Sequence, residues 1–165
     1  MSLSSRTLPT KRHLIPVLLA VALLVAGLAA PALARATTEE VTATMTLAEL
    51  EIEREWMSGP ILHARDAAVT WDLSGDLTGS VELVHNLNIN PTTGQGTGFG
   101  SMTIATDDVT WEGRYRGRYT DGRFAGTFLV HGSDGTVMRG TVTVTALAPI
   151  PVTELEGVIL DPHGG

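Results

Sequence analysis

The chain has 165 residues, of which 43% are hydrophobic and 18 are glycine, and it carries a formal charge of −7. This length fits one compact domain. The chain contains no cysteine, which excludes a disulfide scaffold, a thiolate nucleophile and any zinc or iron–sulfur site built on thiolates.

The N-terminus has the three-part layout of a secretory signal peptide. A basic start precedes an uncharged apolar run over residues 14–30, and small residues in an A-x-A pattern follow. This layout predicts a leader over residues 1–36, cleaved after Ala34 or Ala36, and a protein that is secreted or held in the cell envelope. The alternative is an uncleaved membrane anchor, because the apolar run approaches the length that a membrane span needs.

Removal of the leader changes the charge balance. Cleavage after Ala34 leaves 131 residues with eight arginines, no lysine and all 18 acidic residues, so the mature charge is −10. Nucleic-acid backbones are bound by cationic surfaces, and we therefore expect no nucleic-acid partner.

Alternation of apolar and polar residues recurs from residue 41 onward and predicts strands with one buried face. The expected strands cover 41–47, 69–77, 81–89, 98–105, 109–119, 124–130, 138–144 and 153–160. Residues 49–56 also alternate, although their types favour a helix. We interpret them as strand, with a break in phase between Leu47 and Leu50 that a β-bulge would explain.

Turn signals separate these strands. Asp121-Gly122 and Asp134-Gly135 lie between alternating runs and predict hairpins whose two central residues both have positive φ. Residues 90–94 predict a longer turn, and Thr78-Gly79 another. Successive hairpins predict an all-β domain over residues 37–165, a single antiparallel meander of about eight strands.

A short unit, apolar-x-Gly-x-apolar, recurs in these strands. It is centred on Gly75, Gly113, Gly117, Gly126, Gly140 and Gly157. Glycine costs stability inside a strand, and its repeated use indicates the strongly coiled strands of a closed barrel, which also has no exposed sheet edges. The inward glycines leave space that either facing Trp and Tyr rings fill or a small ligand occupies.

The stretch from Gly96-Thr97-Gly98-Phe99-Gly100 to Gly140-Thr141, with its two Asp-Gly hairpins, resembles the allene oxide cyclase-like barrel superfamily, as does the closing stretch 155–162. This superfamily includes plant allene oxide cyclases, dirigent proteins and many bacterial secreted proteins. The resemblance covers most of the mature chain and implies an eight-stranded antiparallel barrel with an apolar lumen. It carries over no catalytic residue.

Five residues are candidates for the lining of the lumen. His85 is the only ionisable residue on the apolar face of 81–89, where it could orient a ligand, move a proton or simply bond a neighbour as a neutral core histidine. Tyr115 and Tyr119 share an apolar face and could supply hydroxyls or pack at the rim. Trp71 and Trp111 complete the set.

Arg114, Arg116 and Arg118 form a cationic stripe on the opposite face, which we expect outside the barrel. The stripe could hold a carboxylated ligand, but pairing with the alternating glutamates of 49–55 on a neighbouring strand is the simpler interpretation. These glutamates could also collect Ca²⁺, although a solvated face is the simpler reading. The histidines are scattered, and we expect no metal and no cofactor.

Three hypotheses follow for function. The first is a secreted barrel that binds a small apolar or amphipathic ligand. The second is an enzyme of the same shape that guides cyclisation or coupling by confining a reactive substrate, without metal or cysteine. The third is a solid structural or surface-interaction barrel. The sequence lacks the motifs of serine hydrolases, phosphate loops and zinc proteases, and we favour the non-enzymatic first hypothesis.

Overall fold

The protein is described by a computed structural model over residues 36–146 and 151–164. The expected leader falls on residues outside this part of the chain, apart from Ala36. The described residues form strands and turns and no helix, which confirms the all-β prediction. None of them forms a helix of the length and hydropathy that a membrane span requires.

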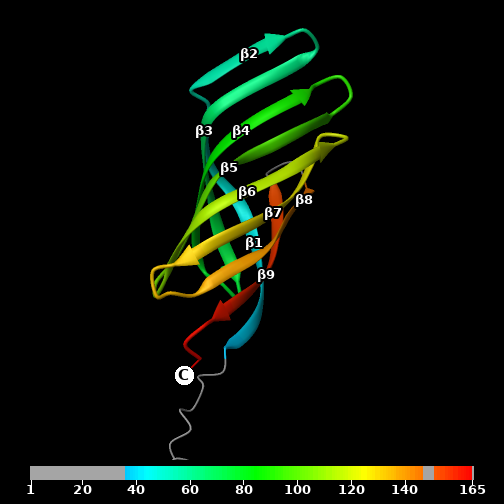
Figure 1. Ribbon diagram of the computed structural model, residues 1–165. Coiled ribbons are helices and arrows are strands. Elements are labelled where there is room, and N and C mark those ends of the chain that lie inside the picture. The colour runs from blue at the N-terminus through cyan, green and yellow to red at the C-terminus, as the bar shows by residue number, and fades with distance from the viewer. Residues whose placement is uncertain (1–35, 147–150, 165) are drawn as a thin grey trace, which may run out of the picture. The chain divides into compact units, whose positions relative to one another are not determined.

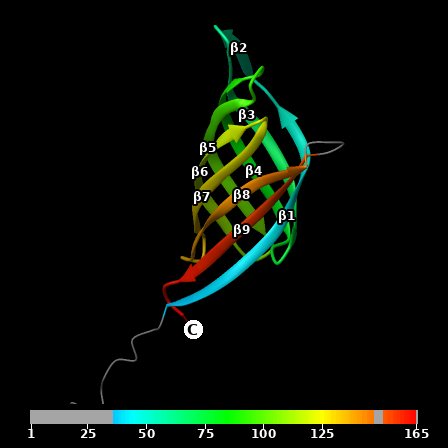
Figure 2. The ribbon, with the colours of Figure 1, turned by 90° about the vertical axis from the view of Figure 1, so that its right-hand side faces the viewer.

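Eight strands form a closed antiparallel barrel, and a ninth extends its sheet (Figures 1 and 2). The strands are β1 (Thr37–Glu51), β2 (Arg54–Ser58), β3 (Ile61–Gly75), β4 (Gly79–Asn90), β5 (Gln95–Thr106), β6 (Thr110–Thr120), β7 (Arg123–Gly132), β8 (Val137–Ala146) and β9 (Val152–Asp161). From β3 to β9 each strand pairs with the next, and β1 lies between β9 and β3 and closes the ring. Among the described strands, β2 pairs only with β3.

The long strand β1 closes the barrel because it changes partners along its length. Residues 37–46 pair with β9, and residues 43–51 pair with β3. The register with β3 shifts between Leu47 and Glu49, which confirms the bulge predicted from the break in phase. A bulge bends and twists its strand, and this one keeps Leu50 on the inner side, where it lines the cavity.

The hairpin of β2 and β3 was not predicted in full. β3 begins at Ile61, well before the expected start at residue 69. Asp66 has a φ of 56°, and the register with β4 shifts between Ala64 and Ala67. This irregularity reverses the inward phase of β3, so the sequence shows no continuous alternation there. The hairpin extends the sheet past β3, with β2 as its last strand (Figure 1).

Only one of the two Asp-Gly turns has the predicted geometry. Asp121 and Gly122 have φ values of 50° and 77°, as a two-residue hairpin turn requires. At the other, only Gly135 has positive φ, and four residues separate β7 from β8. The prediction there is wrong because Asp134 Oδ1 accepts hydrogen bonds from Thr136 N at 3.0 Å and Thr136 Oγ1 at 2.7 Å, which stabilises a longer turn.

The barrel has a packed end and an open end. The packed end carries the turns 76–78, 107–109 and 133–136, and the open end carries the turns 91–94 and 121–122. The most deeply buried side chains are Met45, Val81, Met102, Ile104, Val130, Met138 and Leu155. Inward glycines bring strands and rings together: a Cβ on Gly140 would lie 1.9 Å from Glu156 O and 2.8 Å from Phe128 Cζ. Rings therefore fill part of the space that the glycines leave.

Candidate functional site

A cavity of about 260 Å³ opens at the open end of the barrel. All eight barrel strands contribute to its lining, which includes Met45, Leu47, Leu50, Ile52, Ala67, Val69, Trp71, Leu83, His85, Leu87, Met102, Tyr115, Tyr119, Phe124, Val142, Val144 and Thr153. Leu50 and Ile52 are 53% and 42% exposed, so they form an apolar rim. A dry cavity of about 150 Å³ holds benzene, and this one therefore has room for a larger molecule.

One wall of the cavity carries His85 between two tyrosines. His85 lies on β4, and both Tyr115 and Tyr119 lie on β6. In the intervening strand β5, Gly100 is the residue paired with both His85 and Tyr115. Because Gly100 has no side chain, the imidazole and the phenol ring meet across β5, stacked with their planes 8° apart and their centroids 5.7 Å apart.

Both ring nitrogens of His85 have hydroxyl partners. Nδ1 bonds Tyr115 Oη, and Nε2 lies 2.9 Å from Tyr119 Oη. A neutral imidazole has one N–H donor and one acceptor nitrogen, so one tyrosine accepts from the ring and the other donates to it. Phe124 completes this wall with its ring edge-on to the imidazole at 6.0 Å.

This wall is uncharged at neutral pH. Burial lowers the pKa of His85 to about 4, because desolvation penalises the charged imidazolium. Burial raises the pKa of Tyr119 to about 12, and burial together with the nearby Tyr119 raises the pKa of Tyr115 well above its ordinary value. The three side chains therefore offer hydrogen bonds and aromatic faces without a net charge.

The structure separates the two tryptophans predicted for the lumen. Trp71 lines the cavity. Trp111 lies inside the barrel but in the packed core, where its Nε1 donates to Thr136 Oγ1 at 2.9 Å, and it is not among the cavity residues. Thr153 lines the cavity and was not predicted. Its signal in the sequence was the inward phase that it shares with Leu155, which is fully buried.

The arginine stripe lies on the exposed outer side of β6, as predicted. Its expected partners are wrong. The neighbours of β6 are β5 and β7, which place Ser101 and Leu129 beside Arg114, and Phe99 and Thr127 beside Arg116. Glu49 and Glu51 lie on β1, Glu55 lies on β2 and Glu53 lies between the two strands. Neither strand adjoins β6. Within the described residues, the one ion pair joins Arg54 and Asp66.

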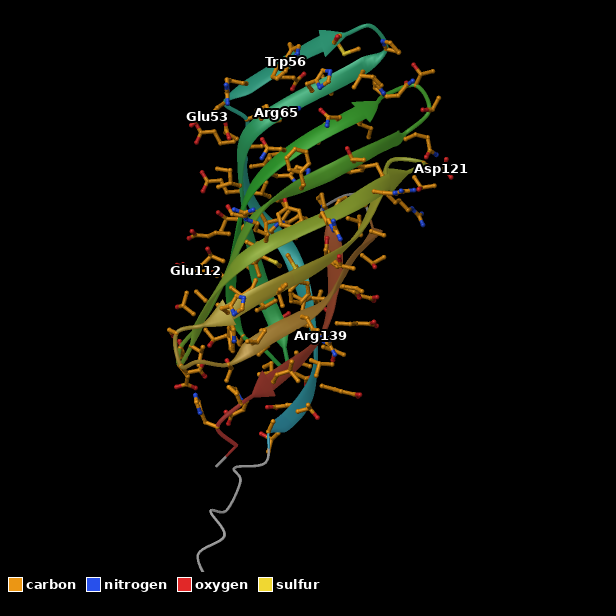
Figure 3. All side chains as sticks on the ribbon, viewed as in Figure 1. Glu53, Trp56, Arg65, Glu112, Asp121 and Arg139 are labelled. Atoms are coloured by element: carbon orange, nitrogen blue, oxygen red, sulfur yellow. The ribbon has the colours of Figure 1, made fainter. Side chains whose placement is uncertain are left out.

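A second cluster on the outer surface was missed because β2 was not foreseen as a separate strand. The rings of Trp56 and His63 stack 5.1 Å apart, and the Arg65 guanidinium lies 5.5 Å from the Trp56 ring and 5.9 Å from the Phe99 ring. Figure 3 shows Trp56 on β2 above Arg65 on β3. Asn88 Oδ1 accepts a hydrogen bond from Arg65 Nη2 at 2.7 Å. These contacts hold the β2 hairpin to the sheet, away from the cavity.

Across residues 36–146 and 151–164, no three histidine or carboxylate side chains gather as a metal site would require. The chain matches no protein-family model and no curated protein.

Proposed function

We propose that the barrel binds one small, uncharged and mostly apolar molecule in the cavity at its open end. The observation that carries the proposal is a space of about 260 Å³ lined by apolar side chains and by the neutral His85–Tyr115–Tyr119 wall. Protein interiors are otherwise packed with few voids larger than a water molecule. A concave apolar site with a few polar groups is the usual form of a small-molecule pocket.

The size and lining of the cavity define the ligand class. Scaling from benzene in about 150 Å³, the cavity accommodates roughly ten non-hydrogen atoms. The Phe124 ring stands edge-on to the His85 imidazole, with 6.0 Å between the two ring centroids. This wall suits a ligand that contains a ring, because aromatic groups prefer edge-to-face and offset contacts. A bicyclic hydrocarbon such as tetralin is the simplest probe of this class.

The proposed setting is outside the cytoplasm. The basic, apolar and small-residue segments of residues 1–36 support export, and the resemblance to the allene oxide cyclase-like superfamily supports a secreted barrel with an apolar lumen. N-terminal sequencing of the exported protein tests this part of the proposal. A first residue of Arg35 or Thr37 is expected, and an intact N-terminus in the exported fraction would contradict it.

The binding proposal is tested by titrating the protein with tetralin and following binding by calorimetry. We expect saturable binding of one molecule per chain. Leu47→Trp places an indole at the cavity and should abolish binding, whereas Leu129→Trp changes a residue that is 49% exposed and should leave binding intact. Absence of binding to the unmodified protein up to the solubility of tetralin would refute the proposal.

A second candidate function is an enzyme that cyclises a confined neutral substrate. The hydrogen-bonded group of His85, Tyr115 and Tyr119 inside the cavity favours it, since such a group can polarise a carbonyl and fix its orientation. The low pKa of His85, about 4, makes the imidazole a weak base, and this supports the binder over the enzyme. Cyclisation of citronellal, a neutral unsaturated aldehyde, tests the candidate: equal rates with the protein and with His85→Phe would remove it.

A further inference from the structure

The wall of the cavity on either side of β1, across the ring of eight strands from β6, carries two polar groups without partners among the described residues. Trp71 lies on β3 and Thr153 on β9, the two strands that flank β1, and both residues line the cavity. Trp71 is paired with Leu47 and Thr153 with Met45, so they stand on either side of β1 at nearby levels. Trp71 Nε1 and Thr153 Oγ1 are buried and have no hydrogen-bond partner within the described part of the chain.

This condition distinguishes them from the other polar groups inside the barrel. Trp111 Nε1 donates to Thr136 Oγ1, and both nitrogens of His85 bond tyrosine hydroxyls. Buried polar groups in proteins almost always have a partner, and an unsatisfied one calls for an explanation. Because both residues line the cavity, a bound molecule is the partner that the site can accept.

The chemistry of the two groups limits what that molecule presents. An indole N–H donates a hydrogen bond and cannot accept one, so the atom facing Trp71 must be an acceptor. A carboxylate would bring a charge into a lining that holds no cationic side chain, because the pKa of His85 is about 4, and burying an unpaired charge is strongly unfavourable. A neutral carbonyl or ether oxygen meets both conditions.

We propose that the natural ligand is a neutral molecule with a carbonyl or ether oxygen at one end, which accepts a hydrogen bond from Trp71 Nε1, and a hydrocarbon body against the His85–Tyr115–Tyr119 wall. Thr153 Oγ1 is the second polar contact on the oxygen side. This inference rests on the proposed function, because it specifies the ligand of the same cavity. It assigns the ligand an orientation, with its oxygen between Trp71 and Thr153 on either side of β1 and its body toward His85 and the two tyrosines of β6.

The test compares two probes that differ by one oxygen, tetralin and the ketone α-tetralone. Their affinities are measured by calorimetry for the unmodified protein and for Trp71→Phe and Thr153→Val. The ratio of ketone to hydrocarbon affinity cancels the change in cavity size that Trp71→Phe introduces. We expect this ratio to fall about fivefold in Trp71→Phe, the usual contribution of one neutral hydrogen bond, and to fall also in Thr153→Val. Trp56→Phe, on the outer surface, should leave the ratio unchanged.

A spectroscopic measurement keeps the inference testable if a variant fails to fold. In the unmodified protein, the indole N–H resonance of Trp71 should move on addition of α-tetralone far more than on addition of tetralin. An unmoved indole resonance, or an equal ratio in all variants, would overturn the inference while leaving hydrocarbon binding intact. Failure of both probes to bind would overturn the proposed function and this inference with it.

Discussion

Acid should lower the free energy of unfolding through His85, in a pH range separate from the one in which carboxyl groups titrate. The pKa of this residue is about 4 in the fold, compared with 6.5 for an unperturbed histidine. The unfolded chain therefore takes up a proton first as the pH falls, and stability is lost between pH 6.5 and pH 4. The two pKa values correspond to about 3 kcal/mol in total, of which about 2 kcal/mol disappears between pH 7 and pH 5.

Urea unfolding at pH 7, 6 and 5 measures this loss, with His85→Gln as the matched variant. Glutamine keeps an amide donor and acceptor for the tyrosines but does not titrate, so its stability should be nearly flat over this range. Hydrogen bonds from Thr42 and Thr136 lower the pKa values of Asp76 and Asp134 from the ordinary carboxyl value, so these two groups titrate below the window. Parallel pH profiles for the two proteins would refute the assignment of a buried neutral His85.

Other substitutions test packing and surface roles by urea unfolding. Leu155→Ala empties a fully buried site and should cost about 2 to 5 kcal/mol, whereas Leu129→Ala, at a residue 49% exposed, should cost less than about 0.5 kcal/mol. Gly98→Val should cost about 1 to 3 kcal/mol and weaken tetralin binding, because a Cβ there would lie 2.7 Å from His85 Cε1; unchanged binding would contradict the packing described. Arg114→Gln should change stability by less than about 0.5 kcal/mol, since no ion pair holds Arg114 within the described residues, and a larger loss would show a partner.

The barrel could be predicted because its signals are local. Alternation identifies an inner face strand by strand, and Asp121-Gly122 encodes a turn that the structure contains. The interruption between Leu47 and Leu50 located the bulge through which β1 passes from β9 to β3. The sequence predicted neither β2 as a separate strand nor the start of β3 at Ile61. Asp66 has positive φ although it is not a glycine, and it reverses the phase in which β3 turns its side chains inward.

The sequence predicted which residues form the polar wall of the candidate site, but it did not predict the contacts between them. His85, Tyr115 and Tyr119 follow from the inward phase of β4 and β6, and the structure brings them together. The contact between His85 and Tyr115 depends on Gly100 of β5, which lies between them without a side chain. The sequence alone does not show which side chains face each other across such a glycine. The same limit produced the wrong partner for the arginine stripe. Trp71 Nε1 and Thr153 Oγ1 lack hydrogen-bond partners within the described part of the chain. The sequence could not show this, because it depends on how β3 and β9 pack on either side of β1.

The most direct test of the account is a crystal structure of the protein with α-tetralone. The account predicts one molecule in the cavity, with its ketone oxygen about 2.9 Å from Trp71 Nε1 and its rings against His85 and Tyr115. A barrel whose own side chains fill that space, with no bound molecule, would contradict it.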